Sequence, residues 1–195
     1  MAREHDSQRR ALIAAMSALP LSRVGNAVAA DRQAAGAHTL VAFFSRSGNT
    51  RVVAGLIQRA LNADVFEIRP ATSYPEDYLA TVAQAKRETD RNFEPALAAR
   101  VERIASYEQI FLGFPIWGTT TPPIIRSFLH AHDLTGKTVI PFVTHGGYGL
   151  GNSLSVLASH AAGARLLRGF VMQADQERST MERVNAWMTD AGIHA

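Results

Sequence analysis

The segment TLVAFFSRSGNT, residues 39–50, decides the fold of this 195-residue chain. It opens with the apolar run Leu40–Phe44, which is typical of a strand buried on both faces. A polar turn, Ser45–Thr50, follows it. Beyond the turn, apolar residues recur at the spacing of one helical stripe, at Val53, Leu56, Ile57, Ala60 and Leu61. The segment therefore predicts a strand, a tight loop and a helix in succession.

The turn between this strand and this helix predicts a phosphate site. Its backbone N–H groups and the positive end of the helix converge on one place. Ser45, Ser47 and Thr50 add hydroxyl donors, and Gly48 has no Cβ to keep a ligand away. The loop lacks both the lysine of the triphosphate-binding loop and the Gly-x-Gly-x-x-Gly dinucleotide motif. We interpret it as a cradle for a phosphate monoester. The alternative is an ordinary strand–helix turn capped by Ser47 or Asn49.

The composition excludes several classes of function. The chain has no cysteine, which excludes disulfides, thiolate chemistry and cysteine-ligated metals. Its formal charge is +3, but beyond residue 30 it carries 16 basic and 15 acidic residues, and no basic stripe alternates with aromatics. We therefore expect no nucleic-acid partner. No spacing of histidines or carboxylates indicates a metal site, and we assign no catalytic side chain.

The N-terminal part, residues 1–38, differs in character from the rest. Arg9-Arg10 precedes a short, mostly apolar stretch, and Ala27-Val28-Ala29 is a small-x-small site of the kind that signal peptidase cuts. The arginine pair resembles a twin-arginine export signal, although Gln8 precedes it and no Phe follows. Cleavage at this site would release a periplasmic protein, which is the location that we expect. The alternative is a retained extension on a cytoplasmic one. The apolar stretch is too short to span a membrane.

Strand and helix patterns alternate through residues 39–195. After the first strand we expect strands at Asp64–Ile68, Gln109–Gly113, Thr138–Thr144 and Arg165–Val171. We expect one helix after a capping box at Ser73–Glu76 and further helices at Pro95–Ala105, Pro122–Ala131 and Gly149–Ala161. A last helix is opened by a capping box at Ser179–Glu182. This order predicts an α/β domain with a doubly wound, five-stranded parallel sheet. Ligands of such sheets bind beyond the carboxyl ends of the strands.

Two further loops lie at that edge of the predicted sheet. The first holds Pro115, Ile116, Trp117, Gly118 and Thr119, and its indole is placed to lie flat against a planar ligand. The alternative is that Trp117 packs the loop onto the domain.

The second of these loops is rich in glycine. Gly146, Gly147 and Gly149 let the backbone approach a ligand closely, and Tyr148 is a second candidate for stacking. The alternative for Tyr148 is a plain turn residue. His145 either hydrogen-bonds a ligand or caps its strand, and both interpretations are open.

Four segments in order resemble the flavodoxin family over Thr39–Ala174. They are FFSRSGNT (43–50), YPEDY (74–78), FLGFPIW (111–117) and GKTVIPFVTHGG (136–147). The resemblance implies the flavodoxin-like strand order 2-1-3-4-5 and non-covalently bound flavin mononucleotide (FMN). The cofactor-binding residues are then Ser45–Thr50 (Ser45, Arg46, Ser47, Gly48, Asn49, Thr50), Pro115–Thr119 and His145–Gly149. Tyr74 and Tyr78 we interpret as packing at the start of a helix.

Three functions remain open, and the first two follow from this resemblance. The first is a redox protein that transfers electrons through its flavin to a partner protein or a small-molecule acceptor. The second is an NAD(P)H-dependent quinone or small-molecule reductase on the same scaffold. The third is a non-redox module that binds another phosphate ligand.

Overall fold

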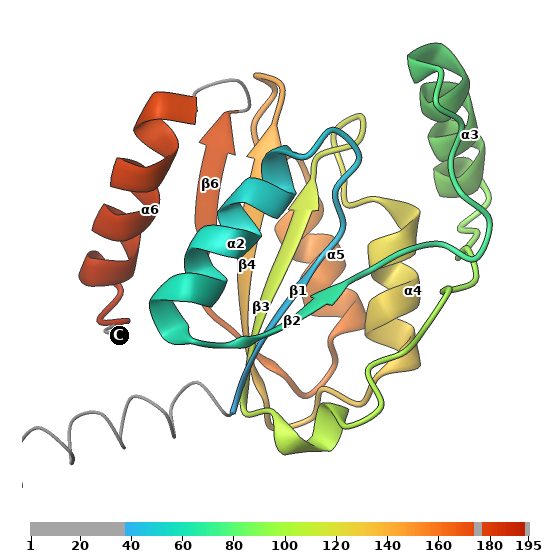
Figure 1. Ribbon diagram of the computed structural model, residues 1–195. Coiled ribbons are helices and arrows are strands. Elements are labelled where there is room, and N and C mark those ends of the chain that lie inside the picture. Colours follow the sequence, from blue (N-terminus) through green and yellow to red (C-terminus); the bar gives the residue numbers. More distant parts are fainter. Residues whose placement is uncertain (1–37, 174–176, 194–195) are drawn as a thin grey trace, which may run out of the picture. The chain divides into compact units, whose positions relative to one another are not determined.

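The computed structural model describes residues 38–173 and 177–193 (Figure 1). The predicted export signal and its cleavage site lie outside the described residues. Within the described part of the chain, no helix is both long and apolar enough to cross a membrane.

A parallel sheet forms the centre of the fold. Its order is β2-β1-β3-β4-β5, with β6 also paired to β4. This is the predicted flavodoxin-like order. The strands are β1 Thr39–Phe43, β2 Asp64–Glu67, β3 Gln109–Pro115, β4 Thr138–His145, β5 Arg165–Leu166 and β6 Phe170–Gln173.

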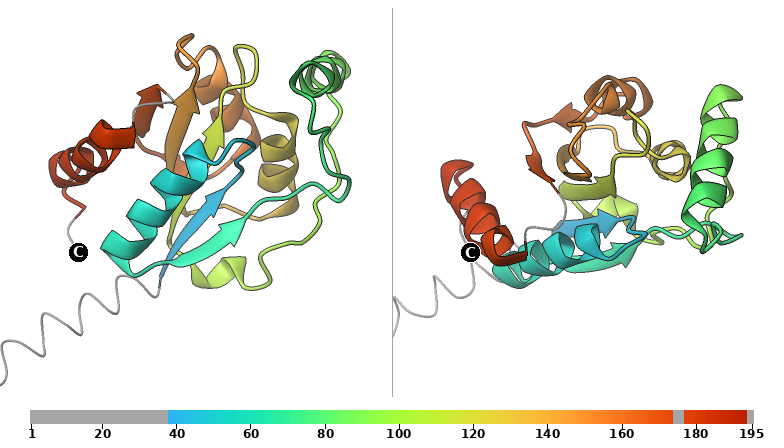
Figure 2. Two further views of the ribbon diagram at one scale, coloured as in Figure 1. Left: turned by 45° about the horizontal axis from the view of Figure 1, so that its top comes forward. Right: turned by 90° about the horizontal axis from the view of Figure 1, so that it is seen from above.

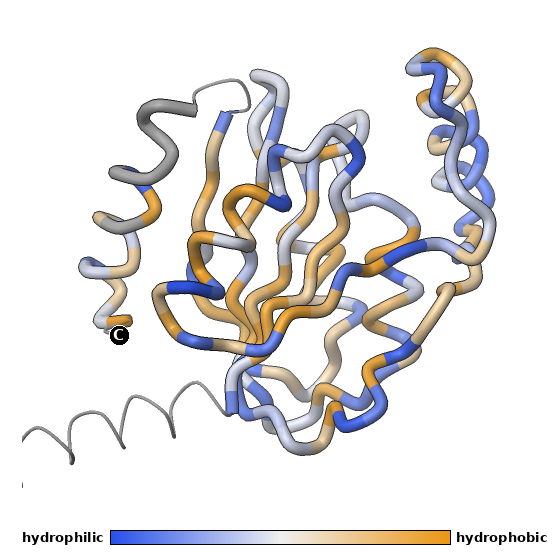
Figure 3. The backbone as a smooth tube through the Cα atoms, in the orientation of Figure 1, coloured by the Kyte–Doolittle hydropathy of each residue, from blue (hydrophilic) through white to orange (hydrophobic). Residues whose placement is uncertain are grey.

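Helices cover both faces of the sheet, as Figure 2 shows from above. On one face lie α2 (Asn49–Leu61) and α6 (Glu177–Asp190). On the other lie α4 (Pro123–Ala131) and α5 (Ser153–His160). Strand β1 contributes side chains to the hydrophobic core on each face of the sheet, because successive side chains of a strand point to opposite faces. Leu40 and Ala42 pack toward α4 and α5, whereas Val41 and Phe43 pack toward α2 and α6. The apolar colouring of the central strands in Figure 3 follows from burial on both sides.

The predicted fifth strand, Arg165–Val171, is split into β5 and β6 where it passes Pro141 of β4. Proline has no N–H to donate, so the ladder cannot continue through it. The backbone comes so close there that a Cβ on Gly169 would lie 1.9 Å from the Pro141 carbonyl oxygen. Both short strands still pair with β4 in parallel. Pro141 therefore leaves its own strand, β4, continuous and interrupts the neighbouring strand that pairs with it.

Three helix predictions need correction. The predicted helix Pro95–Ala105 is wrong, because Ala96 and Ala98 instead exchange backbone hydrogen bonds with the segment after β2, and only Ile104–Ser106 forms a 3-10 turn. The cap predicted at Ser73 is wrong, since Asp77 caps α3 (Tyr78–Asp90) by accepting from the Ala80 N–H at 2.7 Å. The last helix begins at Glu177, before the predicted box at Ser179. The first prediction fails because this segment pairs with residues 69–71. The second fails because Asp77 lies nearer to the start of α3 and caps it.

Helix α3 stands away from the sheet, beyond its β2 side (Figures 1 and 2). It buries only Thr81, Ala85 and Glu88, two of which are polar. By contrast, α2 buries Thr50, Val53, Ala54 and Ile57 against the strands. Residues of α3 and of the loops at the carboxyl edge of the sheet line one cleft, which is the candidate site.

Candidate functional site

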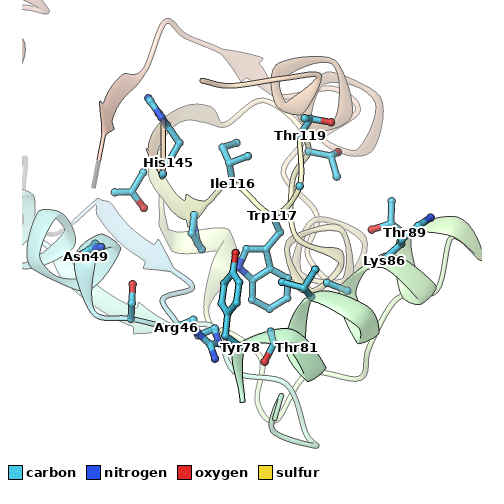
Figure 4. Close-up of a pocket in the computed structure, with 18 of the residues that line it drawn as sticks. Arg46, Asn49, Tyr78, Thr81, Lys86, Thr89, Ile116, Trp117, Thr119 and His145 are labelled. Atoms are coloured by element: carbon cyan, nitrogen blue, oxygen red, sulfur yellow. The ribbon is translucent and has the colours of Figure 1, made fainter. Parts of the chain in front are cut away.

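A cleft of about 650 Å³ opens at the carboxyl ends of β1, β3 and β4. Its walls come from the loop after each of these strands and from helix α3 (Figure 4). The three loops are those that the sequence places at this edge. Parallel strands align their carboxyl ends, which is why residues from positions 46 to 146 meet here.

The first loop, Ser45–Gly48, is held in shape by one serine hydroxyl. The Ser45 Oγ accepts hydrogen bonds from the backbone N–H groups of Gly48 at 3.2 Å and Arg51 at 3.3 Å. Gly48 has a left-handed φ of 97°, and a Cβ there would meet nothing within 4 Å. The loop therefore turns its open side outward at the N-terminus of α2. The first turn of α2 carries no acidic residue to offset the positive end of the helix.

Besides Arg46, two polar side chains of the segment 45–50 line the cleft and two others do not. Ser47 and Asn49 line it, whereas Ser45 faces its own loop and Thr50 is 1% exposed. The Thr50 hydroxyl shares a 2.9 Å hydrogen bond with that of Thr144. This buried contact ties the start of α2 to the end of β4, so it fixes the position of the loop.

Arg46 joins the first loop to helix α3. Its Nη2 donates to the Glu76 carbonyl oxygen at 2.7 Å, and its guanidinium lies 5.7 Å from the centre of the Tyr78 ring. Arginine over a tyrosine face is a cation–π contact. The arrangement places a positive charge beside the loop that we expect to hold a phosphate.

The loop after β3 presents Trp117 on a tight turn. Trp117 and Thr120 exchange backbone hydrogen bonds of 3.1 and 3.2 Å, and Gly118 between them has a φ of 63°. The indole is half-buried, with Phe44 and Tyr74 packed edge-on at centroid distances of 5.2 and 4.7 Å. Edge-on rings fix the orientation of the indole and leave its remaining surface to the cleft.

Tyr74 is itself anchored by a buried carboxylate. Its hydroxyl donates to Glu88 Oε2 at 2.9 Å, and Gln84 donates to the other oxygen of Glu88 at 2.8 Å. Burial, together with the nearby Glu88 charge, raises the pKa of the Tyr74 phenol well above its ordinary value. The phenol therefore stays protonated and keeps donating. A hydrogen-bonded chain thus runs from helix α3 to the ring that supports Trp117.

The loop after β4 is organised by His145, which also lines the cleft. Its Nδ1 accepts from the backbone N–H groups of Gly147 at 3.0 Å and Gly149 at 3.3 Å. Since these amides can only donate, the neutral imidazole carries its proton on Nε2. His145 therefore caps its own loop, and its second nitrogen remains able to donate.

The loops after β3 and β4 touch at Gly151. A Cβ at this residue would lie 1.8 Å from the Thr119 carbonyl oxygen, and Gly151 has a φ of 53°. The Thr119 carbonyl also accepts from the Asn152 N–H at 3.0 Å. Only glycine permits this approach, so Gly151 sets how closely the two loops stand.

The cleft gathers most of the cofactor-binding residues predicted from the sequence. Ten of the sixteen line it: Arg46, Ser47, Asn49, Pro115, Ile116, Trp117, Gly118, Thr119, His145 and Gly146. Ser45, Gly48, Thr50, Gly147, Tyr148 and Gly149 are not among its lining residues. Tyr148 is 84% exposed. Its role in stacking stays a prediction.

The sequence interpretation missed one wall of the cleft. This wall consists of α3 residues, namely Tyr78, Thr81, Val82, Ala85, Lys86, Thr89 and Asp90. A signal was present, because the large residues Tyr78, Leu79 and Val82 lie in the first half of a helix whose second half is mostly polar and charged. Their exposure in the structure shows that they are not core residues.

Comparison with known proteins gives one family. The flavodoxin family model (Flavodoxin_4) matches residues 38–191. No curated protein matches the chain.

Similar solved structures carry flavoprotein names. A candidate flavoprotein from Bacteroides eggerthii DSM 20697 is 32% identical, covers 79% of this chain and 97% of its own, and has a TM-score of 0.69. One from Bacteroides uniformis ATCC 8492 is 31% identical over 77% and 99%, with a TM-score of 0.67. A flavoprotein from Lactobacillus acidophilus NCFM, solved in complex with FMN, is 21% identical over 74% and 97%, with a TM-score of 0.62. The family match spans nearly all of the described residues, and this chain belongs to the flavodoxin family.

Proposed function

We propose that this protein binds FMN non-covalently and transfers electrons through it. The observation that carries the proposal is the meeting of two features in one cleft. The loop at the N-terminus of α2 and the indole of Trp117 both face it. Such a pair suits a ligand with a phosphate at one end and a planar ring at the other.

The residues of the cleft fit this cofactor. Ser47, Asn49 and the amides at the start of α2 offer donors, and Arg46 adds a positive charge for a phosphate dianion. A Cβ at Gly118 or Gly146 would meet nothing within 4 Å, so a ring can approach the backbone there. When bound, FMN supplies one- and two-electron redox chemistry that amino-acid side chains lack. Membership of the flavodoxin family supports the same cofactor.

The test compares FMN with riboflavin, which has the same ring but no phosphate. The apoprotein is titrated with each and the quenching of flavin fluorescence is followed. Two charge-assisted hydrogen bonds to the phosphate make FMN bind about a hundredfold more tightly. Equal affinities would contradict the phosphate site. Uptake of neither compound would leave only the third function, a non-redox phosphate module.

A pair of serine variants locates the phosphate. Ser47→Ala removes a hydroxyl that lines the cleft, so FMN affinity falls while riboflavin affinity does not. Ser159→Ala is the control, because Ser159 lies on α5 and donates to the Val156 carbonyl away from the cleft. Equal effects of the two substitutions on FMN affinity would argue against a phosphate at this loop.

Electron transfer is tested on the FMN-loaded protein. A carrier reduced by dithionite is reoxidised by a partner protein and does not react directly with NADPH. Rapid bleaching of the flavin absorbance on stopped-flow mixing with NADPH would favour the reductase instead. The cleft extends past the three loops to α3, and this extension favours a small-molecule acceptor as a second candidate.

We also propose export through the N-terminal signal. The twin-arginine route carries folded proteins, so it suits a protein that must be loaded with a flavin before export. N-terminal sequencing of the protein from its native cell tests this. A mature chain that begins just after Ala29 supports export, and one that begins at Met1 or Ala2 contradicts it.

A further inference from the structure

A bound FMN has to reach two loops of the cleft at once. We assign its phosphate to the loop before α2 and its ring to Trp117 on the loop after β3. The phosphate and the ring of FMN are joined by a short chain, so both ends bind together only if the two loops stand at a matching distance. A residue that fixes this distance therefore belongs to the site, even if its side chain does not contact the ligand.

Thr144, next to the end of β4, is bonded to both of these parts of the chain. Its hydroxyl shares the 2.9 Å hydrogen bond with that of Thr50 in the first turn of α2. Its carbonyl oxygen accepts from the N–H of Ile116 at 2.8 Å, one residue before Trp117. It also directly precedes His145, which organises the loop after β4. Thr144 is therefore connected to each of the three loops that line the cleft.

The contact between Thr144 and Thr50 is deeply buried. The two residues are 2% and 1% exposed, so water does not compete for their hydrogen bond. A buried hydroxyl that loses its partner pays the full cost of leaving water, and this cost resists any separation of the pair. The bond is also a long-range one, because 94 residues separate its partners along the chain. It therefore holds the start of α2 against β4 more firmly than a surface contact would.

Each half of the proposed FMN site keeps its own shape by other contacts. The phosphate loop is held by Ser45, whose Oγ accepts from the N–H groups of Gly48 and Arg51. The indole of Trp117 is held by two rings packed edge-on against it. Loss of the Thr144 hydroxyl leaves both sets of contacts in place. Its main consequence is then a change in the spacing between the two halves.

We infer that Thr144 is a positioning residue for FMN, because its bond to Thr50 sets the spacing between the phosphate loop and the loop that carries Trp117. The inference rests on the proposed function for the identity of the ligand. Thr144 is among the lining residues, but its hydroxyl is bonded to Thr50. The hydroxyl therefore matters for a ligand that occupies both loops and not for a ligand that occupies one.

Three ligands distinguish the spacing of the loops from the quality of each loop. Riboflavin occupies the ring site alone, inorganic phosphate occupies the phosphate loop alone, and FMN occupies both. The two flavins are titrated by fluorescence, and inorganic phosphate is measured by its competition with FMN. Thr144→Val keeps the shape of the side chain but replaces the hydroxyl by a methyl group. We expect it to lower FMN affinity about tenfold and to change the affinities for riboflavin and inorganic phosphate by less than about twofold.

Two further variants isolate the hydroxyl at this position. Thr144→Ser keeps the hydroxyl and binds FMN within about twofold of wild type. Thr144→Ala differs from Thr144→Ser only by the loss of that oxygen, and it repeats the loss of about tenfold. Because the two side chains are both small, this pair also gives an answer if Thr144→Val does not fold. Equal FMN affinities of the serine and alanine variants would overturn the inference.

Thr121→Val is the matched control. Thr121 is also 2% exposed, its hydroxyl donates to the Ser153 carbonyl oxygen at 3.3 Å, and it does not line the cleft. The substitution removes a buried hydrogen bond of the same kind but leaves α2 bonded to β4. FMN affinity should therefore stay within about twofold of wild type. A loss as large as that of Thr144→Val would overturn the inference, because any lost buried bond would then suffice.

A double-mutant cycle tests whether Thr144 acts through Thr50. Thr50→Val removes the other half of the bond. In that background Thr144→Val has no bond left to break, so we expect it to change FMN affinity by less than about twofold. A further tenfold loss would overturn the inference, because Thr144 would then act on the ligand by another route.

The riboflavin titration separates this inference from the proposed function. If wild type binds FMN no more tightly than riboflavin, the proposed phosphate site fails and the inference fails with it. If wild type prefers FMN about a hundredfold and Thr144→Val keeps this preference, the inference alone fails. Equal losses of FMN and riboflavin affinity in Thr144→Val would also overturn the inference alone, since the hydroxyl would then support the ring site itself.

Discussion

Helices α2 and α3 have the same length, 13 residues, but opposite roles in the structure. Helix α2 packs on the sheet, and its Val53 and Ile57 are fully buried. Helix α3 packs chiefly on α4 and leaves apolar residues exposed toward the cleft. The difference shows that the two helices contribute to the cleft in different ways. Packing on the sheet holds α2 and the loop before it in place, whereas α3 lines the cleft with Tyr78 and Val82, which the core has not covered.

The largest expected effect separates the two helices by stability. Ile57→Ala removes a fully buried side chain between α2 and the sheet, so we expect the free energy of unfolding to fall by about 2–5 kcal/mol. Leu79→Ala on α3 changes it by less than about 0.5 kcal/mol, because Leu79 is exposed. Urea unfolding followed by circular dichroism measures both. Equal losses would show that α3 is as deeply integrated as α2.

A pair of glycines tests the contact between the loops after β3 and β4. Gly151→Ala would drive a Cβ into the Thr119 carbonyl, so we expect a loss of about 2 kcal/mol or more in stability and weaker FMN binding. Gly149→Ala is the control, since Gly149 has a φ of 72° but open space around it. Both substitutions strain a backbone with a positive φ, but only Gly151→Ala adds a steric clash. A similar loss of FMN affinity in the two would mean that the contact between the loops does not shape the site.

A pair of tyrosines tests the connection between α3 and Trp117. Tyr74→Phe keeps the ring but leaves the buried Glu88 short of a donor, so stability falls by about 1–3 kcal/mol. Tyr107→Phe removes an equivalent bond to Asp64, at 2.7 Å and away from the cleft. We expect only Tyr74→Phe to weaken FMN binding as well. Fluorescence titration measures this, and equal FMN affinities would deny Tyr74 a positioning role.

Two aromatic residues compare a lining ring with an exposed one. Trp117→Ala weakens FMN binding by about 1–3 kcal/mol if its ring stacks on the flavin. The sequence pattern predicts the same loss for Tyr148→Ala. The exposure of Tyr148 leads us to expect a smaller effect, because its ring does not line the cleft. Flavin titration ranks the two. A larger loss for Tyr148→Ala would require its loop to close over the ligand.

The smallest expected effect concerns a buried histidine next to α4, the helix against which α3 packs. His132 follows α4; its Nε2 accepts from the Val101 N–H at 3.0 Å, and its Nδ1–H donates to the Phe128 carbonyl. Burial lowers the pKa of His132 in the folded state. The unfolded chain therefore binds more protons, and stability falls as pH drops from about 6.5 through the folded pKa.

His132→Gln removes this titration and retains a donor and an acceptor. Thermal unfolding between pH 7.5 and 5 should then depend less on pH in the variant than in wild type. The same pH dependence in both proteins would assign it to other groups.

Much of the fold could be predicted because local patterns and global packing agree. The run Leu40–Phe44 faces two cores, and that alone indicates a central parallel strand. The order of strands and loops then places Ser47, Trp117 and His145 at one edge. The segment after Pro95 could not be predicted, since its apolar spacing mimics a helix while backbone pairing with residues 69–71 holds it extended. The break between β5 and β6 depends on Pro141 in a different strand.

The sequence by itself determined the family, the parallel sheet and the three loops at its carboxyl edge, because strand periodicity and loop chemistry are local properties. Only the tertiary structure decided which hydroxyls of the first loop face the cleft, since Ser45 and Thr50 find partners within the protein. It also decided the wall formed by α3. The position of that helix depends on contacts with α4 and on the bond from Tyr74 to Glu88, and neither can be inferred from the order of residues.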